Sequence, residues 1–222
     1  MNVVALWSGG KDSAYAYLLA KQQSHKVLSL LTLMLNKEKS NFHLIHSDLI
    51  DAQAKATGVA IFKKITTPQT YEIDFKTALT DLKTKGAQGL ITGDICEAIG
   101  HESGWLDRIC KEVGLTPIKP LWLGNTNQIY LNYLKTGLKA TVVRTNKNLS
   151  IDWLGRTLDH SFYTDIQKHP EIDPCGEGGE YHTLITDGPD FKQKIQLIET
   201  EKKRLDNGSG YLEIKKWKVT QK

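Results

Sequence analysis

The segment Ser8-Gly9-Gly10-Lys11-Asp12-Ser13 constrains this chain more than any other feature. It follows the apolar run Val3–Trp7, which predicts a buried strand, and it precedes residues 14–19, whose apolar positions have helical spacing. The glycine pair permits a sharp turn and lets a ligand approach the backbone closely. The helix start is expected to present unpaired N–H groups and a positive dipole end, both of which suit a phosphate. With Lys11 as an added charge and two serine hydroxyls, the segment predicts an anion-binding loop.

This segment is not a Walker loop, because the pattern Gly-x-x-x-x-Gly-Lys-Ser/Thr is absent. It resembles the pyrophosphate-binding loop Ser-Gly-Gly-x-Asp-Ser of the ATP pyrophosphatase (PP-loop) superfamily, also called adenine nucleotide alpha hydrolase-like. The resemblance implies cleavage of ATP between the α and β phosphates, often with formation of an acyl-adenylate. The alternative is a simple strand–helix turn in which Asp12 serves only as the N-cap.

Composition limits the classes of protein that this chain can belong to. The 222 residues suffice for one large domain or for one domain with an appendage, and 40% hydrophobic and 24% charged residues are ordinary for a globular protein. The net charge of +4 is mild, so a dedicated nucleic-acid binder is not expected. The Lys-rich segments 202–204 and 215–218 are interpreted as the solvated face of an edge strand.

Targeting and redox signals are few. Apolar stretches of membrane-spanning length are absent, and the first residues predict a strand rather than a signal peptide. The cysteines Cys96, Cys110 and Cys175 form no Cys-x-x-Cys pair, so neither a zinc site nor a disulfide framework is indicated. A reducing cytoplasm is the expected location.

The first half of the chain alternates between strand and helix patterns. Strands are expected at Val27–Leu33, Val59–Ile65 and Gln88–Thr92, and helices at Asp48–Ala56, Tyr71–Lys85 and Ser103–Val113. Such βα units predict a parallel sheet that binds ligands at the carboxyl ends of its strands. Both the Ser8–Ser13 loop and Gly93-Asp94 follow predicted strands, so we expect them at the same edge of the sheet.

The alternation of strand and helix patterns ends near Pro117–Pro120, which indicates that a second domain begins there. We place the boundary at residue 124, giving domains 1–124 and 125–222. In the second domain we expect a helix at Thr126–Lys135, a strand at Ala140–Arg144, a polar helical stretch to His169, and a final hairpin whose turn is Asp206–Gly210.

A second glycine-rich segment, Asp173-Pro174-Cys175-Gly176-Glu177-Gly178-Gly179-Glu180-Tyr181-His182-Thr183, is too polar for a core element. Its glycines predict backbone packed around a bound molecule, and its carboxylates suit Mg²⁺ or an ammonium group. An acidic surface turn leading into the strand Thr183–Thr186 is the alternative.

This second segment, followed by Asp187-Gly188-Pro189-Asp190-Phe191, resembles the signature of the diphthine–ammonia ligase family of PP-loop proteins. The supporting matches are the Ser8–Ser13 loop, Gly93-Asp94-Ile95, Pro120-Leu121-Trp122, Leu154-Gly155-Arg156 and Leu158-Asp159. The resemblance implies an α/β domain of the HUP type that binds ATP, followed by a smaller α+β domain. It also implies that a substrate carboxylate is adenylated in a cleft and then attacked by ammonia, with AMP and pyrophosphate released.

The resemblance also assigns roles to residues of this chain. Ser8, Gly9, Gly10, Lys11, Asp12 and Ser13 would hold the phosphates of ATP, and Gly93 and Asp94 would lie beside the nucleotide. Leu33, at the carboxyl end of the second predicted strand, is a candidate neighbour of adenine or a core residue. Lys11, Asp12, Glu177, Glu180 and His182 are the catalytic candidates, with Mg²⁺ assigned to Asp12 and Glu177.

The sequence departs from the family at Cys96-Glu97-Ala98-Ile99-Gly100-His101, where diphthamide-pathway members carry a Ser-x-Tyr-Gln-Arg type of stretch. The second motif with His182 is more similar to that of the short bacterial members, so the identity of the carboxylate substrate stays open. Whether the protein forms a homodimer also stays open. The nitrogen donor is not identified either, and free ammonia is the simplest choice. The rival hypotheses are a nucleotide-binding regulator without ligase activity and a tRNA-modifying PP-loop enzyme. His43 and His46 are candidates for a substrate entrance or ordinary loop residues, and Cys175 is interpreted as structural.

Overall fold

The computed structural model describes residues 1–40, 45–97 and 102–222, which divide into two compact units. Unit 1 comprises residues 1–8 and 12–123, and unit 2 comprises residues 9–11 and 124–222. The masked segments 41–44 and 98–101 contain His43 and most of the Cys96–His101 departure, which therefore lie outside the described residues.

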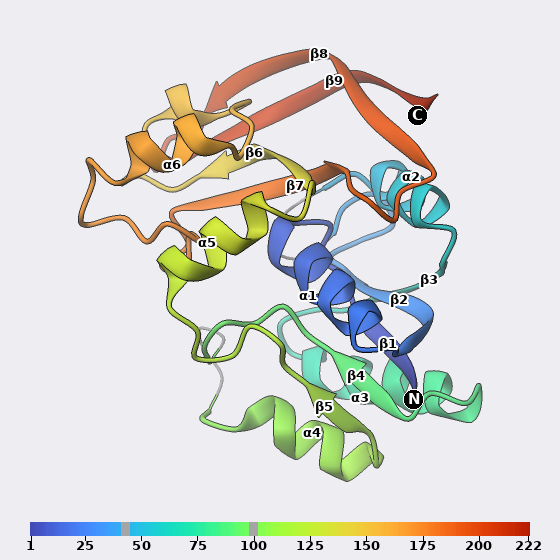
Figure 1. Cartoon of the computed structure of the whole chain (residues 1–222). Helices are drawn as coiled ribbons and strands as arrows, with labels where there is room; N and C mark the ends of the chain where they lie inside the picture. Colours follow the sequence, from blue (N-terminus) through green and yellow to red (C-terminus); the bar gives the residue numbers. More distant parts are fainter. Residues whose placement is uncertain (41–44, 98–101) are drawn as a thin grey trace. The chain divides into compact units, whose positions relative to one another are not determined.

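Unit 1 is built on a five-stranded parallel sheet (Figure 1). Its strands are β1 (Asn2–Leu6), β2 (Lys26–Met34), β3 (Ala60–Ile65), β4 (Gly89–Ile91) and β5 (Thr116–Ile118), arranged in the order β3-β2-β1-β4-β5. The helices between them are α1 (Lys11–Gln22), α2 (Ser47–Thr57), α3 (Tyr71–Thr84) and α4 (Trp105–Val113). The strand order reverses at β1, which places the topological switch point between β1 and β4. The predicted α/β fold class is confirmed.

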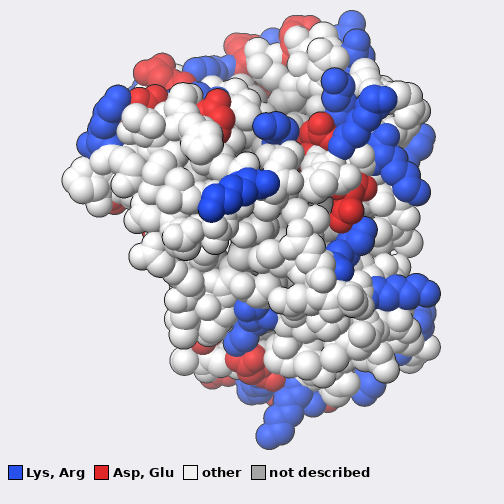
Figure 2. Space-filling model, viewed as in Figure 1, with Lys and Arg blue, Asp and Glu red and all other residues white. Residues whose placement is uncertain are grey.

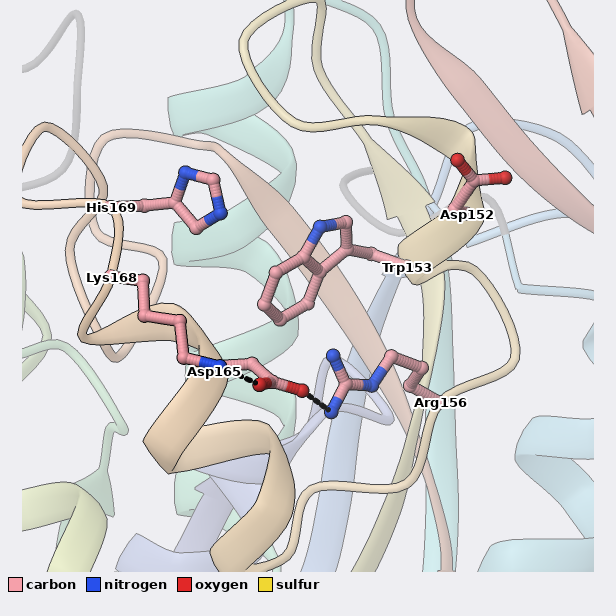
Figure 3. A pocket seen from close by; sticks show the side chains of 6 residues that line it. All are labelled: Asp152, Trp153, Arg156, Asp165, Lys168 and His169. Carbon is pink, nitrogen blue, oxygen red and sulfur yellow. Dashed lines mark hydrogen bonds and ion pairs between the residues drawn. The ribbon is translucent and has the colours of Figure 1, made fainter.

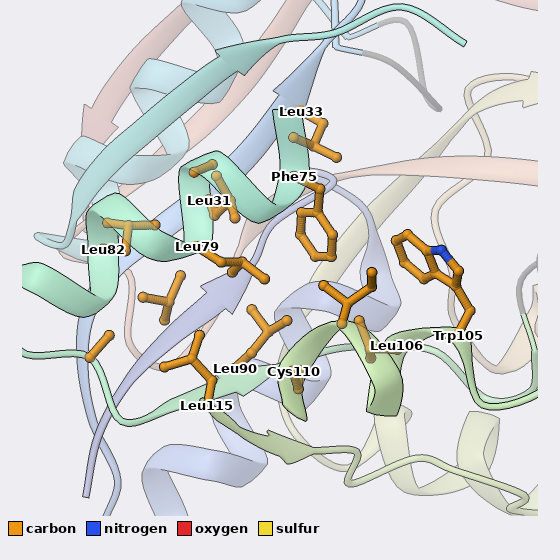
Figure 4. Close-up of a cluster of buried hydrophobic side chains, with 14 residues drawn as sticks. Leu31, Leu33, Phe75, Leu79, Leu82, Leu90, Trp105, Leu106, Cys110 and Leu115 are labelled. Carbon is orange, nitrogen blue, oxygen red and sulfur yellow. The ribbon is translucent and has the colours of Figure 1, made fainter. Parts of the chain in front are cut away.

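The hydrophobic core of unit 1 fills the space between α3, α4 and the sheet (Figure 4). α4 buries Trp105, Leu106, Ile109 and Cys110, a spacing that puts all four on one helical face. The Phe75 ring of α3 stacks on the Trp105 ring with centroids 5.6 Å apart. This packing fixes both helices against β4, whose carboxyl end carries candidate site residues.

Unit 2 contains a four-stranded sheet in the order β7-β6-β9-β8, all pairs being antiparallel. Its elements are α5 (Thr126–Leu134), β6 (Lys139–Thr145), the 3₁₀ helix η1 (Ile151–Trp153), α6 (His160–Ile166), β7 (Tyr181–Asp187), β8 (Gln193–Arg204) and β9 (Gly210–Gln221). The α+β class predicted for the C-terminal part is confirmed, as is the hairpin, here β8–β9. None of the helices in the described parts of the chain is long and apolar enough to cross a membrane.

The structure differs from the sequence predictions at two elements. β5 was not among the predicted strands; its Pro117, which cannot donate to a ladder, is tolerated because β5 is the edge strand of its sheet. The expected helical stretch up to His169 is instead two short helices separated by loop. Ser150 and Asp159 each cap a new helix through a side-chain oxygen, which restarts the helix rather than continuing it.

Candidate functional site

The first candidate loop leaves the carboxyl end of β1 and turns into α1. Gly9 has φ +83°, the left-handed region that glycine enters without strain, and α1 begins two residues later. The hydroxyls of Ser8 and Ser13 lie 3.1 Å apart, so the two ends of the loop are hydrogen-bonded to each other. Asp12 is the second residue of α1 rather than its N-cap, which contradicts the simple capping alternative.

Gly93 follows β4 and packs directly on this loop. A Cβ built on Gly93 would lie 2.5 Å from the backbone carbon of Asp12 and 2.6 Å from the backbone nitrogen of Ser13. No side chain fits there, so glycine is needed for the end of β4 to contact the start of α1. The structure thus brings together, at the switch point, two segments that the sequence placed at separate strand ends.

Asp94 follows Gly93, and its carboxylate is held by a hydrogen bond from a residue of the same turn. The Thr92 hydroxyl donates to Asp94 Oδ2 at 2.6 Å. Tyr71, which the sequence analysis did not single out, lies near this carboxylate: burial first, and then the charge of Asp94, raise the pKa of Tyr71. Its ring packs against Phe75 and Trp105. An aromatic at the start of a helix gives no functional signal, so the sequence could not distinguish Tyr71 from core.

Residues 9–11 of the loop belong to unit 2, because their backbone is hydrogen-bonded to β7. The Ile185 N–H donates to the Gly9 carbonyl at 2.8 Å, and the Lys11 N–H donates to Thr183 Oγ1 at 3.0 Å. The expectation that the helix-start N–H groups are unpaired is therefore wrong for Lys11. Thr183, the last residue of the second motif, is a contact that the sequence missed.

The side chain of Lys11 is also engaged. It is 5% exposed; its ammonium donates to the carbonyl oxygen of Cys175 and lies 5.2 Å from the centroid of the Tyr181 ring. The first loop thus contacts the second glycine-rich segment through one buried cation.

That second segment, the acidic loop Asp173–Glu180, is closed by its own carboxylates. Asp173 Oδ1 accepts the N–H groups of Cys175 at 2.7 Å and Glu177 at 3.3 Å, and Glu180 Oε1 accepts the Asp173 N–H at 3.2 Å. Glu180 is 7% exposed, and its carboxylate lies so close to Gly178 that a Cβ on this glycine would be 2.6 Å from Oε1. Glu180 therefore holds the loop together, a role that the sequence had not separated from catalysis.

The other two candidates of this motif are more accessible. Glu177 is partly exposed at the middle of the loop, and His182 is partly exposed on β7, paired with Arg144 of β6. Burial lowers the pKa of Arg144 below its ordinary value. Glu177 and His182 are thus open to solvent to a degree that the buried Glu180 is not.

The positions of the remaining candidates from the sequence are explained by packing, helix capping or hydrogen bonding within the fold. Leu33 is 5% exposed and belongs to the hydrophobic core cluster of unit 1, so core packing accounts for it. His46 is the N-cap of α2, where its Nδ1 accepts the Asp48 N–H. The buried Cys175 thiol donates to the Thr126 carbonyl at 3.3 Å, which agrees with its interpretation as structural.

The positive charge of the chain is concentrated in the β8–β9 ribbon. Its two strands carry seven Lys and Arg and three Glu, which equals the net +4 of the whole chain. Glu201 pairs with Lys203 and Lys215. The edge strand predicted from the Lys-rich segments is confirmed for 202–204, which lies in the edge strand β8, but is wrong for 215–218, which lies in β9 between β6 and β8. Figure 2 shows basic and acidic side chains interspersed on the visible face, with the densest basic group at its upper right.

A pocket of about 220 Å³ lies in unit 2, apart from all the predicted site residues (Figure 3). It is lined by Asp152, Trp153, Arg156, Asp165, Lys168 and His169. The Arg156 guanidinium lies 4.5 Å from the Trp153 ring centroid and donates to Asp165 at 2.8 Å. Arg156, part of a matching family motif, is therefore bound within unit 2, where it fixes η1 to α6.

Within residues 1–40, 45–97 and 102–222, no group of three or more His, Cys, Asp and Glu is placed to hold a metal ion. Magnesium bound with a nucleotide takes most of its ligands from phosphates and water, so one or two carboxylates suffice. The assignment of Asp12 and Glu177 to Mg²⁺ stays a prediction.

Comparisons with known proteins cover nearly the whole chain. A family model described as Diphthamide synthase N-terminal domain matches residues 1–117, and one described as Diphthamide synthase C-terminal domain matches residues 125–220. A mouse protein named diphthine–ammonia ligase is 25% identical over 90% of this chain and 84% of its own length. A Schizosaccharomyces pombe protein of the same name is 26% identical over 97% of this chain and 39% of its own length.

Among solved structures, a protein from Methanocaldococcus jannaschii described as a predicted subunit of tRNA methyltransferase is 16% identical. The alignment covers 85% of this chain and 97% of that one, with a TM-score of 0.49, and supports no functional assignment.

Proposed function

Because this chain belongs to the diphthamide synthase family, we propose that it is an ATP-dependent ligase that converts a substrate carboxylate into an amide with ammonia. The curated relatives are named as ligases. This name agrees with the family and the enzyme class that the sequence motifs predicted. Within the structure, the observation that carries the proposal is the Ser8–Ser13 loop at the switch point, packed on Gly93 with no room for a side chain.

The residues present fit an ATP phosphate group. A glycine turn with φ +83°, two serine hydroxyls and the first turn of α1 supply donors for anionic oxygens. We assign Ser8, Gly9, Gly10, Asp12 and Ser13 to the phosphates, Asp12 also to Mg²⁺, and Gly93 and Asp94 to the nucleotide. ATP supplies the adenylyl group that makes the carboxylate reactive.

The proposed reaction has two steps, adenylation of the carboxylate and then its amidation. A carboxylate oxygen attacks the α-phosphorus of ATP, and the bond to pyrophosphate breaks. The nitrogen of ammonia then attacks the acyl carbon, the bond to AMP breaks, and one proton is released. Donors arranged around the departing phosphates stabilise the charge that builds there, and holding the reactants in line supplies much of the remaining rate.

In this scheme Lys11 turns from the Cys175 carbonyl to the phosphates, where a cation has most effect. We assign His182 to receive the proton that ammonia loses, since a neutral imidazole can act as a base near neutral pH. Glu177 is assigned to Mg²⁺ or substrate. Glu180 is assigned to positioning, because its carboxylate already binds the loop that contains Glu177.

The test is the pattern of products. Incubating the protein with ATP, Mg²⁺ and candidate carboxylates should release AMP and pyrophosphate, and each accepted carboxylate should support exchange of labelled pyrophosphate into ATP without ammonia. Formation of ADP and phosphate would contradict the proposal. A nucleotide-binding regulator would bind ATP but catalyse no exchange with any carboxylate.

A further inference from the structure

The buried ammonium of Lys11 lies among groups that bind ammonium ions in general. The Lys11 ammonium donates a hydrogen bond to the carbonyl oxygen of Cys175, and its nitrogen lies over the Tyr181 ring, 5.2 Å from the ring centroid. Carbonyl oxygens accept hydrogen bonds from an ammonium group, and aromatic faces attract a compact cation. Lys11, Cys175 and Tyr181 all belong to unit 2.

These groups are held rigidly by the surrounding loop. The Cys175 carbonyl shares its peptide group with the Gly176 N–H, which donates to the Asp173 carbonyl at 2.9 Å, and the Cys175 thiol donates to the Thr126 carbonyl. Tyr181 is 2% exposed, its hydroxyl donates to the Pro174 carbonyl, and its ring packs edge-on against Phe162 at 5.3 Å. The carbonyl and the ring therefore keep their places whether or not Lys11 occupies them.

A second observation comes from Tyr130 of α5. Its side chain is 1% exposed, and its hydroxyl has no hydrogen-bond partner within the described chain. The Tyr130 ring stacks on Phe162 with centroids 5.9 Å apart, and Phe162 also packs against Tyr181, so Tyr130 belongs to the same aromatic cluster as the ring beside Lys11. Burial raises the pKa of Tyr130, and the charge of Lys11 opposes that rise. An unsatisfied buried hydroxyl is destabilising, and it is explained if a polar ligand bonds to it in another state.

We propose that this position, formed by the Cys175 carbonyl, the Tyr181 ring and the Tyr130 hydroxyl, is the ammonium subsite of the ligase. The side-chain ammonium of Lys11 occupies it in the present structure, and a free ammonium ion replaces it when Lys11 turns to the phosphates of ATP. This inference rests on the proposed function, in which ammonia is the nitrogen donor and Lys11 binds phosphate.

The exchange of one ammonium for another couples the two substrates. When ATP binds, the Lys11 ammonium leaves the subsite and binds the phosphates. When a free ammonium ion fills the subsite, Lys11 can no longer return to it and stays available to ATP. Each ligand therefore tightens the binding of the other by the same factor, because coupling between binding sites is reciprocal. The coupling can be measured without knowledge of the carboxylate substrate.

The first test is calorimetric titration with α,β-methylene-ATP and Mg²⁺ in ammonium chloride and in sodium chloride of equal ionic strength. The wild type should bind at least threefold more tightly in ammonium chloride. Tyr130→Phe, which removes only the hydroxyl, should abolish most of that ratio. The matched control is Tyr163→Phe: the Tyr163 ring stacks on Tyr130 at 5.2 Å, but its hydroxyl donates to Asn127.

The second test uses Lys11→Met, which removes the resident ammonium. Ammonium chloride should then raise the Tm of the nucleotide-free variant relative to sodium chloride, with no such difference in the nucleotide-free wild type. Equal affinities in both salts, an equal loss in Tyr163→Phe, or identical salt responses of Lys11→Met and wild type would overturn the subsite. Absence of nucleotide binding in either salt would instead overturn the proposed function.

Discussion

The two glycine-rich loops look alike in sequence but are built in opposite ways. The Ser8–Ser13 loop is shaped by backbone: a left-handed glycine, an early helix start, and the close approach of Gly93. The Asp173–Glu180 loop is shaped by side chains, since Asp173 and Glu180 accept N–H groups of their own loop. A carboxylate in a glycine-rich motif therefore does not by itself indicate a ligand contact.

The difference separates two glutamates that the motif presents as equivalent. Glu180 is 7% exposed and bonded to Asp173, whereas Glu177 is partly exposed. We expect substitutions to divide accordingly: those in the first loop and at Glu177 should act on ligand binding, and those at Glu180 should act on stability.

The largest effect is expected from Gly93→Ala. The added Cβ would lie 2.5 Å from the Asp12 backbone, so α1 or β4 must move. We predict a loss of α,β-methylene-ATP affinity of tenfold or more, and a loss of stability of about 1–3 kcal/mol from overpacking. Calorimetry and urea unfolding measure the two.

Gly86→Ala is the matched control for this change. Gly86 has φ +96° and open space around it, so the substitution adds backbone strain without a clash. It should lower stability and leave nucleotide affinity unchanged. If both variants bound the nucleotide as the wild type does, the close packing of Gly93 on the loop would not be required for binding.

The second-largest effect is expected from Glu180→Ala, which should lower the stability of the fold. It leaves the Asp173 N–H without its acceptor and opens space beside Gly178, which should cost about 1–3 kcal/mol in the free energy of unfolding. Glu171→Ala, at a side chain 62% exposed on the same segment, is the control and should change stability little. Equal unfolding midpoints for the two variants would refute the bracing role of Glu180.

Glu177→Gln should show the reverse behaviour. Because Glu177 is partly exposed, its unfolding free energy should stay within about 0.5 kcal/mol of wild type. The Mg²⁺ dependence of nucleotide binding should weaken severalfold if this carboxylate contributes to the metal. A magnesium titration followed by calorimetry measures this, and an unchanged dependence would remove Glu177 from the metal assignment.

The smallest effect is expected at a surface cluster of unit 1. Hydrogen bonds from Arg108, then Lys76, then Trp105 hold the pKa of Glu72 below its ordinary value of 4.5. The depressed value means that the charged form stabilises the fold; this contribution is complete above pH 4.5 and is lost as the pH falls toward the folded pKa.

Glu72→Gln should therefore lower Tm at pH 6 and differ less from wild type at pH 3. With the Glu72 side chain 37% exposed and screened by solvent, the effect should be about 1 kcal/mol or less. Thermal unfolding between pH 3 and 6 measures it, and a gap that stays constant with pH would show that the charge of Glu72 is not the cause.

The sequence predicted what depends on local pattern and contiguous motifs. The parallel sheet followed from alternating apolar runs and glycine stops, and the first loop from six adjacent residues. It missed β5, whose Pro117 is tolerated only because the strand lies at an edge. The short β5 segment carries no run of charges that would mark it as an edge strand, and its position at the edge is set by how the strands pack.

The site was less predictable for the same reason. The contacts of Gly9 and Lys11 with β7 join residues more than 170 positions apart. The structural role of Glu180 and the unsatisfied hydroxyl of Tyr130 depend on burial, which a polar motif and an ordinary helix do not reveal.

The central claim, that the Ser8–Ser13 loop binds the phosphates of ATP, is tested most directly by a single binding measurement. Titration of Mg²⁺ and α,β-methylene-ATP into the wild type and into Ser13→Ala by calorimetry should give saturable binding in the first and an affinity at least tenfold lower in the second. Saturable binding of equal affinity in both proteins, or no binding in the wild type, would contradict the account.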